Sequence, residues 1–276
     1  MSAFWEVKLR ENHILRAALL PLLRIERMLT VKQYRKSNDS QYIKSLENSC
    51  FGERCFIIGN GPSLKKSDLE LLRNEKTFAF NRIYSMYKYT NWRPTYYMAI
   101  DTSVLHEMCR QNKHLVEAEY IFLTNRKLVK WYKRQNRNAY RIVLDGEMPI
   151  RKERLALKKL STDVSKYVSR PQSVTISAFE FAFYMGFKEI YLLGIDHSFA
   201  VEIDMKGNRS FNNKVESHFH EDEDKSPYSS NKESLTQNYE ICKKYADRKG
   251  IKVVNVTRGG CLEVFERGIL EEVLKV

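Results

Sequence analysis

Cys55-Phe-Ile-Ile-Gly-Asn-Gly-Pro-Ser63 is the stretch that decides the fold, because a short apolar run ends there in a glycine turn. A capping serine and helical spacing follow over 67–73, so the order is strand, turn and helix. Glycine allows close backbone approach and unusual φ values where such a turn is tight. We therefore predict a strand over 55–59 that opens a strand-and-helix unit.

The chain beyond this unit continues to alternate between strand and helix patterns, and it contains no internal repeat. Strands are expected at Thr77–Phe80, Tyr96–Ile100, Tyr120–Leu123, Arg141–Val143, Ile190–Leu193 and Lys252–Val256, with helices at Val104–Gln111, Lys127–Arg134, Val174–Met185 and Leu235–Lys249. This alternation predicts a Rossmann-like α/β domain over 51–276, with a mainly parallel sheet and helices on both faces. The ligand site of such a sheet lies at the carboxyl ends of its strands.

The glycine turn itself predicts a site for nucleotide phosphates, because its backbone amides can point at an anion where a helix begins. The predicted binding residues of the turn are Gly59, Asn60, Gly61, Pro62 and Ser63. The turn lacks the third glycine of a dinucleotide fingerprint and the lysine spacing of a Walker A loop. A purely structural turn is the alternative, with Ser63 as a helix cap.

Other polar residues fall at the same predicted edge of the sheet. Asn81 and Asp101 end two strands, and Ser173 and Thr175 begin a helix that can bind a second anion. The alternative for each is a helix cap or a turn residue. We include all four in the predicted nucleotide site.

Acid and imidazole side chains supply candidate catalytic groups. Asp196 and His197 are adjacent at a strand end, and His218 and His220 lie in a polar stretch, about 200–231, that we expect to be a lid loop. A histidine is the natural proton acceptor near neutral pH, and either pair is also capable of metal binding. We expect no obligatory metal, and the alternative for the second pair is a solvated acidic loop.

Charge and cysteine content limit the classes of partner. The formal charge is +13, and fourteen Lys or Arg against four Asp or Glu between Arg126 and Arg170 supply most of it. Such a surface attracts anionic partners, or is simply a solvated face; no nucleic-acid motif accompanies it, so nucleic acid is not expected. The five scattered cysteines contain no CxxC pair and predict reduced thiols. No signal peptide or membrane-spanning run is apparent, so a cytoplasmic location is expected.

Residues 1–50 are expected to form a separate helical appendage. The stretch from His13 to Leu29 is apolar on one side and carries Arg16, Arg24 and Arg27 on another, and Pro21 should kink it. A basic amphipathic helix can lie peripherally on the inner face of a membrane or pack against its own domain or a second subunit, which leaves a homo-oligomer open.

Four motifs together resemble a known family. They are Phe56-Ile-Ile-Gly-Asn-Gly-Pro-Ser-Leu64, the segment from Gly186 to His197, Ser217-His-Phe-His220 and the segment from Asn255 to Arg267. They are similar to the MptE-like family, named for a 6-hydroxymethylpterin diphosphokinase, in its bacterial surface-polysaccharide branch. The same motifs also resemble Rossmann-like bacterial sialyltransferases and motility accessory factors.

The sialyltransferase likeness implies that Asn60, Gly61, Asn81 and the turn from Ser173 to Thr175 contact a cytidine nucleotide. It also implies a catalytic histidine, and the spacing here leaves His218 and His220 open for that role. Asp101 stands where that family has an asparagine, which suits Mg²⁺ beside ATP phosphates better.

Three functions follow from these observations. The leading hypothesis is a glycosyltransferase that moves a sugar, sialic-acid-like for example, from a CMP-type nucleotide-sugar donor to a glycan acceptor, a cell-surface glycan precursor. The alternative is a Mg²⁺- and ATP-dependent diphosphokinase, with Asp101 and Asp196 as metal ligands. The third is a non-catalytic accessory protein that binds a nucleotide or glycan.

Overall fold

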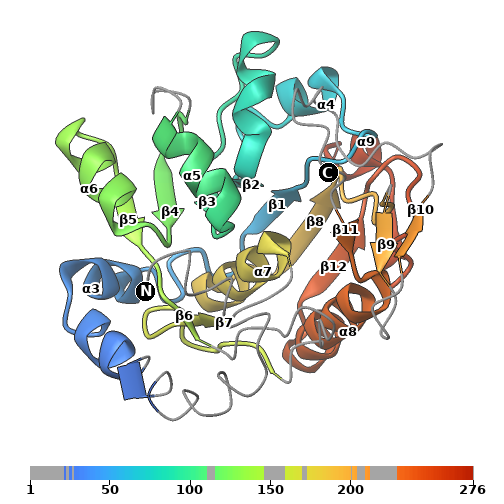
Figure 1. Cartoon of the computed structure of the whole chain (residues 1–276). Helices are drawn as coiled ribbons and strands as arrows, with labels where there is room; N and C mark the ends of the chain where they lie inside the picture. Colours follow the sequence, from blue (N-terminus) through green and yellow to red (C-terminus); the bar gives the residue numbers. More distant parts are fainter. Residues whose placement is uncertain are drawn as a thin grey trace.

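The sheet at the centre of the protein is parallel throughout. The computed structural model describes residues 22, 25–26, 28–110, 116–145, 159–169, 173–199, 201–203, 209–211 and 229–275. Its eight-stranded sheet has the order β13-β12-β8-β1-β2-β3-β4-β5 (Figure 1). The strands are β1 (Arg54–Ile58), β2 (Thr77–Phe80), β3 (Tyr96–Ala99), β4 (Tyr120–Leu123), β5 (Ala139–Arg141), β8 (Glu189–Leu193), β12 (Lys252–Asn255) and β13 (Glu266–Arg267). The predicted Rossmann-like α/β fold is confirmed.

Helices connect these strands and cover the sheet on both faces (Figure 1). They are α3 (Asn38–Ser45), α4 (Lys66–Leu71), the 3₁₀ helix η1 (Asn81–Lys88), α5 (Thr102–Arg110), α6 (Arg126–Arg134), α7 (Val174–Met185), α8 (Lys232–Lys249) and α9 (Leu270–Val273). Among the described residues, no helix is both long enough and apolar enough to cross a membrane.

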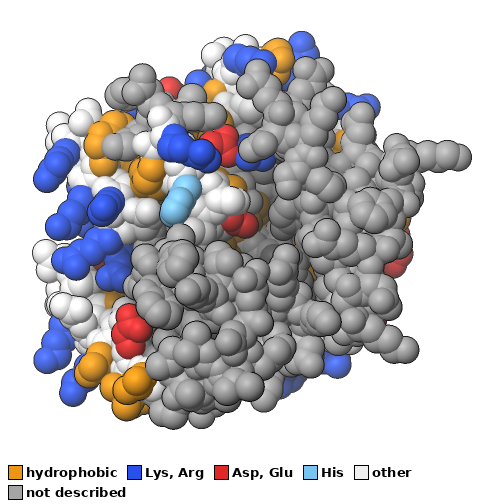
Figure 2. All heavy atoms as spheres, in the orientation of Figure 1, with side chains coloured by type: hydrophobic (Ala, Val, Ile, Leu, Met, Phe, Trp, Pro, Cys, Tyr) orange, Lys and Arg blue, Asp and Glu red, His pale blue; other side chains and the backbone are white. Residues whose placement is uncertain are grey.

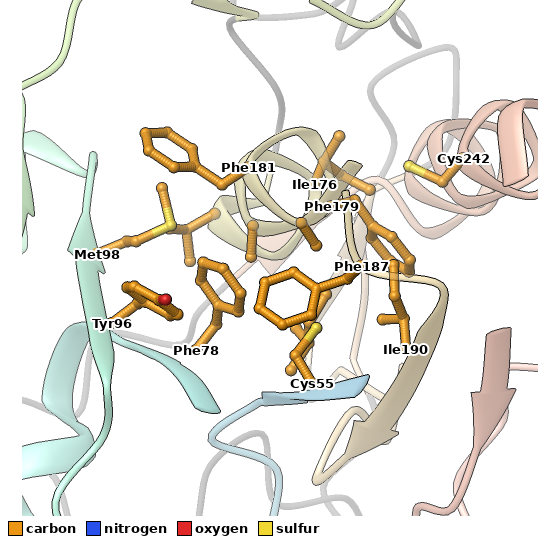
Figure 3. Close-up of a cluster of buried hydrophobic side chains, with 14 of the residues drawn as sticks. Cys55, Phe78, Tyr96, Met98, Ile176, Phe179, Phe181, Phe187, Ile190 and Cys242 are labelled. Carbon is orange, nitrogen blue, oxygen red and sulfur yellow. The ribbon is translucent and has the colours of Figure 1, made fainter. Parts of the chain in front are cut away.

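Each central strand sends alternate side chains into two separate cores. In β1, Cys55 and Ile57 join the core under α3, α7 and α8, whereas Phe56 and Ile58 join the core under the helices of the other face. Figure 3 shows the first core, in which Phe78 lies beside Tyr96 with ring centroids 4.6 Å apart. Burial on both faces explains why these strands are continuous apolar runs in the sequence.

Helix α7 is buried on every side and lies over the middle of the sheet (Figure 1). It begins at the capping residue Ser173 and ends at Gly186, whose φ of +87° is the left-handed conformation that glycine adopts without strain. The amides of Asn48, Cys50 and Gly52 donate to the last carbonyls of this helical segment at 3.0, 2.9 and 3.2 Å. The chain before β1 therefore caps the carboxyl end of α7.

The segment before residue 50 packs on the same core as the strands. Ile43 and Cys50 are buried in the core under α7, and the ring of Tyr42 stacks on Tyr140 with centroids 3.8 Å apart. The division into a 1–50 appendage and a 51–276 domain stays a prediction, and the expected kink at Pro21 lies outside the described residues.

Several expected elements differ in extent. The strand expected at 141–143 is β5, which ends at Arg141. Beyond it the chain leaves the large sheet, and the Val143 carbonyl accepts from the Val168 amide. This bond lies beside a small sheet of β6 (Leu144–Asp145) and β7 (Val168–Ser169). The expected lid of irregular structure contains β9 (Val201–Ile203), β10 (Arg209–Phe211) and β11 (Ser229–Ser230), which form a three-stranded sheet. Helix α4 is shorter than its expected 67–73 range.

Glu180 is a fully buried carboxyl that joins α7 to the 159–169 segment. Its two oxygens accept hydrogen bonds from the amides of Ser161 at 2.6 Å and Ser169 at 3.0 Å. Burial outweighs these bonds and raises the pKa of Glu180 to about 7. The carboxyl therefore holds a proton in the folded protein at a pH where the unfolded chain has released it.

We predict that the free energy of unfolding falls as the pH rises from about 4.5 to about 7, by about 3 kcal/mol in all, because the unfolded chain releases this proton in that range while buried Glu180 keeps it. In Glu180→Gln this slope should disappear, while the melting temperature falls at every pH because one amide then faces the Gln NH₂ group. Thermal unfolding across this range, with the exposed Glu240→Gln as the matched control, measures both effects. An unchanged slope in Glu180→Gln would show that other groups carry it.

Candidate functional site

The pocket lies where the strand order of the sheet reverses. From β1 the chain adds β2, β3, β4 and β5 on one side, and β8, β12 and β13 extend the sheet on the other. In open parallel sheets, ligands bind outside the carboxyl ends of the strands at this reversal. A cavity of about 170 Å³ lies at this place, lined from the ends of β1, β2, β3 and β8, the start of α7 and one side of α8.

Nine of the predicted site residues line this one cavity. They are Gly59, Asn60, Gly61, Asn81, Asp101, Ser173, Thr175, Asp196 and His197. Pro62 and Ser63 are not among the described residues that line it. The topology thus brings together residues that are up to 138 positions apart in the sequence, from Gly59 to His197.

The glycines of the turn are required by protein packing. The amides of Gly59 and Gly61 donate to the carbonyls of Leu193 and Gly194 at 2.8 and 2.9 Å. A Cβ on Gly61 would lie 1.8 Å from Asp196 Oδ2, and one on Gly59 would lie 2.3 Å from the Gly194 carbonyl oxygen. The expectation that these two amides point at an anion is corrected here, since both already have backbone partners.

Ser63 and Asp196 bind each other across the turn. Ser63 Oγ donates to Asp196 Oδ2 at 2.7 Å, and the Asp196 carbonyl accepts from the Cys261 amide at 2.7 Å. Burial raises the pKa of Asp196, although its hydrogen bonds to Ser63 oppose the shift. We call the turn 59–63, held against 194–196 by these bonds, the glycine clasp.

Two asparagines present unpaired acceptors at the cavity. Asn60 Nδ2 donates to the Phe80 carbonyl at 3.2 Å, which turns Asn60 Oδ1 away from that bond, and this buried oxygen has no partner among the described residues. Asn81 Oδ1 is likewise buried without a described partner, on a residue whose φ is +49°. Unpaired buried acceptors are costly and indicate a missing donor.

Asp101 and Ser173 act as helix caps while they line the cavity, and Thr175 lines it from the first turn of α7. Asp101 Oδ1 accepts from the amide and the hydroxyl of Ser103, both at 2.7 Å, at the start of α5. Ser173 Oγ accepts from the Thr175 amide at 3.3 Å and donates to Thr175 Oγ1 at 3.1 Å. The positive end of the α7 dipole therefore faces the cavity and favours an anionic ligand group there.

His197 is held in one tautomer by α8. Thr236 Oγ1 donates to the Lys232 carbonyl at 2.9 Å, so its hydrogen is used and it accepts from His197 Nε2–H at 2.8 Å. The lone pair of His197 is then on Nδ1, which is buried without a described partner. Burial, with a smaller effect of Lys232, lowers the pKa of His197 to about 4.

The backbone of His197 is also unusual. Its φ of +54° is the left-handed conformation, and it is one of two non-glycine residues at the cavity with positive φ, Asn81 being the other. Such conformations cost about 1 kcal/mol or more and gather at functional sites. At neutral pH, His197 is an uncharged and oriented hydrogen-bond acceptor.

Several residues at or beside the cavity were not predicted from the sequence, and three of them have polar groups that bear on its chemistry. Arg82 lines the cavity and donates to Glu107 through Nε at 2.9 Å and Nη2 at 2.6 Å. Its position directly after the strand-end residue Asn81 was a usable signal. Thr236 and the cavity-lining Tyr239 come from the middle of a helical pattern, which contains no such signal.

His218 and His220 lie outside the described residues, so their role as candidate bases stays a prediction. Within the described part of the chain, no group of three or more His, Cys, Asp or Glu side chains is placed to hold a metal ion. Among the described residues, the cavity lining thus combines buried acceptors without a partner, the N-terminus of α7 and the side chain of Arg82.

The chain matches one family model and is similar to two solved structures. The family model described as "6-hydroxymethylpterin diphosphokinase MptE-like" matches residues 30–202, which confirms the resemblance seen in the motifs. The structure of the sialyltransferase CstII from Campylobacter jejuni with cytidine-5'-monophosphate is 19% identical, covers 80% of this chain and 86% of that chain, and has a TM-score of 0.48. A second CstII structure, with CMP-3FNeuAc, is 18% identical, covers 78% and 85%, and has a TM-score of 0.46.

No curated protein matches the chain. The identities and TM-scores of the two structures are too low to bear on the substrate or the reaction of this chain.

We predict that Gly61→Ala breaks the glycine clasp, because the added methyl group overlaps the Asp196 carboxylate. Overpacking of this kind costs about 1–3 kcal/mol, and the melting temperature should fall by several degrees. Gly250→Asn is the matched control, since a Cβ there meets no atom within 4 Å and asparagine tolerates the left-handed conformation. Equal melting temperatures for the two variants would contradict the clasp.

Proposed function

The chain belongs to the 6-hydroxymethylpterin diphosphokinase MptE-like family, and we propose that it is a transferase that binds a nucleotide in the cavity at the strand-order reversal. The observation that carries this proposal is the set of unpaired acceptors, Asn60 Oδ1, Asn81 Oδ1 and His197 Nδ1, gathered beside the N-terminus of α7. A nucleotide supplies both kinds of partner, since its ribose hydroxyls and base amino group donate and its phosphates are anionic.

The reaction we propose is transfer of a sugar from a CMP-type donor to a cell-surface glycan precursor. The start of α7 and Arg82 would face the phosphate and stabilise the negative charge that develops as the sugar departs. Asn60 and Asn81 would accept hydrogen bonds from the nucleoside. A sialic-acid-like sugar is our working choice for the donor.

His197 and the lid histidines would have different roles. With a pKa of about 4, His197 is too weak a base to match chemistry near neutral pH, so it would orient a ligand hydroxyl through Nδ1. The proton of the acceptor hydroxyl would go to His218 or His220, as predicted from the sequence. Asp196 would support the clasp and would not transfer a proton.

A diphosphokinase is the second candidate, because the family is named for that activity. It requires Mg²⁺ beside ATP phosphates, for which the sequence offered Asp101 and Asp196. The described residues do not fit a site held by both carboxylates, since Asp196 is buried against Gly61 and bonded to Ser63. A non-catalytic accessory protein is the third candidate. Nucleotide binding without any turnover would identify it.

We predict that CMP without a metal ion raises the melting temperature. A ligand at about 100 times its Kd stabilises by about 2.7 kcal/mol, which corresponds to about 5 °C or more for a chain of this size. Differential scanning fluorimetry with CMP, CDP, UDP, GDP and ATP, each with and without Mg²⁺, makes the measurement.

Asn60→Ala should reduce the CMP effect, whereas the exposed Asn138→Ala should preserve it. Stabilisation by ATP with Mg²⁺ alone would favour the diphosphokinase. If no nucleotide stabilises the protein, the site itself is misassigned.

We predict that His197 remains neutral and protonated on Nε2 down to about pH 5, which ¹⁵N NMR of the labelled imidazole measures directly. Thr236→Val removes the acceptor for Nε2–H, so the Nδ1–H tautomer should gain population and nucleotide affinity should fall about tenfold. Thr236→Ser keeps the hydroxyl and should retain both properties. A wild-type imidazole that titrates near pH 6.5 would refute the assignment.

A further inference from the structure

Helix α6 presents a row of cations at the outer edge of the sheet. Leu128, Val129 and Tyr132 are buried against the sheet. The exposed basic residues of this segment are Arg126, Lys127, Lys130, Lys133, Arg134 and Arg137. Of these six, Lys133 alone has an ion-pair partner in the described part of the chain, which is Asp39 in α3. The row therefore carries a large uncompensated positive charge.

An apolar stripe is exposed on the helical stretch at 22, 25–26 and 28–34. Leu22, Ile25, Met28 and Leu29 are 62%, 53%, 69% and 61% exposed. At about 100° per residue they span an arc of about 120°, centred opposite Tyr34, which is buried. An amphipathic helix ordinarily buries its apolar side, whereas this one turns it outward.

The cationic row and the apolar stripe share one edge of the molecule. Helix α3, which follows the apolar stripe in the sequence, is anchored at β5, the edge strand next to α6. The stacked rings of Tyr42 and Tyr140 and the ion pair of Lys133 with Asp39 hold it there. Figure 2 shows Lys and Arg side chains along the side of the molecule over α6 and α3, with hydrophobic side chains next to them. We call this surface the basic edge.

We propose that the basic edge docks on the surface of an anionic lipid bilayer. The charge complementarity selects an anionic partner, and the exposed Leu and Ile side chains select one with an apolar interior. A nucleic acid offers no apolar interior for such a stripe. A second copy of the chain would bring two cationic rows together, and these would repel each other. Each cation near an anionic membrane adds about fivefold to the affinity, and the inserted side chains supply the second attachment that stable peripheral binding requires.

The test is co-sedimentation of the full chain with vesicles of phosphatidylcholine, with and without phosphatidylglycerol, at about 0.1 M salt. We expect binding only when phosphatidylglycerol is present. The triple variant Lys127→Gln, Lys130→Gln and Arg134→Gln should bind roughly 100-fold more weakly. The triple variant Lys244→Gln, Arg248→Gln and Lys249→Gln on α8 removes the same charge and should bind as wild type.

A second variant tests the apolar stripe. Ile25→Gln and Leu29→Gln together leave the charge unchanged and should weaken vesicle binding at least tenfold, since two apolar side chains no longer enter the bilayer. Equal binding by the α6 and α8 variants, or binding of an RNA oligonucleotide that outcompetes vesicles, would overturn the proposal. Nucleotide-induced stabilisation measured without vesicles is independent of this edge, so the transferase proposal fails or survives separately.

Discussion

The glycine clasp is the constraint on which the site depends. Two neighbouring parallel strands, β1 and β8, end at the same level, and the chain leaving each must turn without colliding with the other. The contact of Gly61 with the Asp196 carboxylate leaves no room for any side chain, and the Ser63 hydroxyl satisfies the oxygen that is brought there. Once these turns are fixed, Asn60 and His197 both line one cavity.

Both side chains are then oriented by hydrogen bonds to neighbouring residues. The carbonyl of Phe80, at the end of β2, determines which atom of the Asn60 amide is left unpaired, and Thr236 on α8 does the same for the His197 ring. Leaving these acceptors unpaired lowers the stability of the folded state, and burial in the large cores on each face of the sheet offsets this loss. A preorganised site of this kind binds a ligand without first having to reorder its own side chains.

The sequence predicted the fold well, because burial on both faces makes each central strand a continuous apolar run such as Phe56 to Ile58. It also predicted which residues meet, since polar residues at strand ends share an edge in a parallel sheet. It misjudged what the glycines do: a strand followed by Gly-Asn-Gly has the same letters whether a phosphate or a neighbouring carboxylate fills the space. The orientation of His197 by Thr236 was beyond reach, because it depends on how α8 packs and not on any local pattern.

Helix α7 has a consequence of its own. Its first turn lines the cavity, its last turn is capped by residues 48–52, and it is buried along its whole length of about 18 Å. Burial on every side opposes bending or rotation of such a helix, so it forms a packed link between the chain that leads to the basic edge and the wall of the cavity. Residue 50 and Ser173 are far apart in the sequence, but α7 joins their surroundings into one mechanical unit.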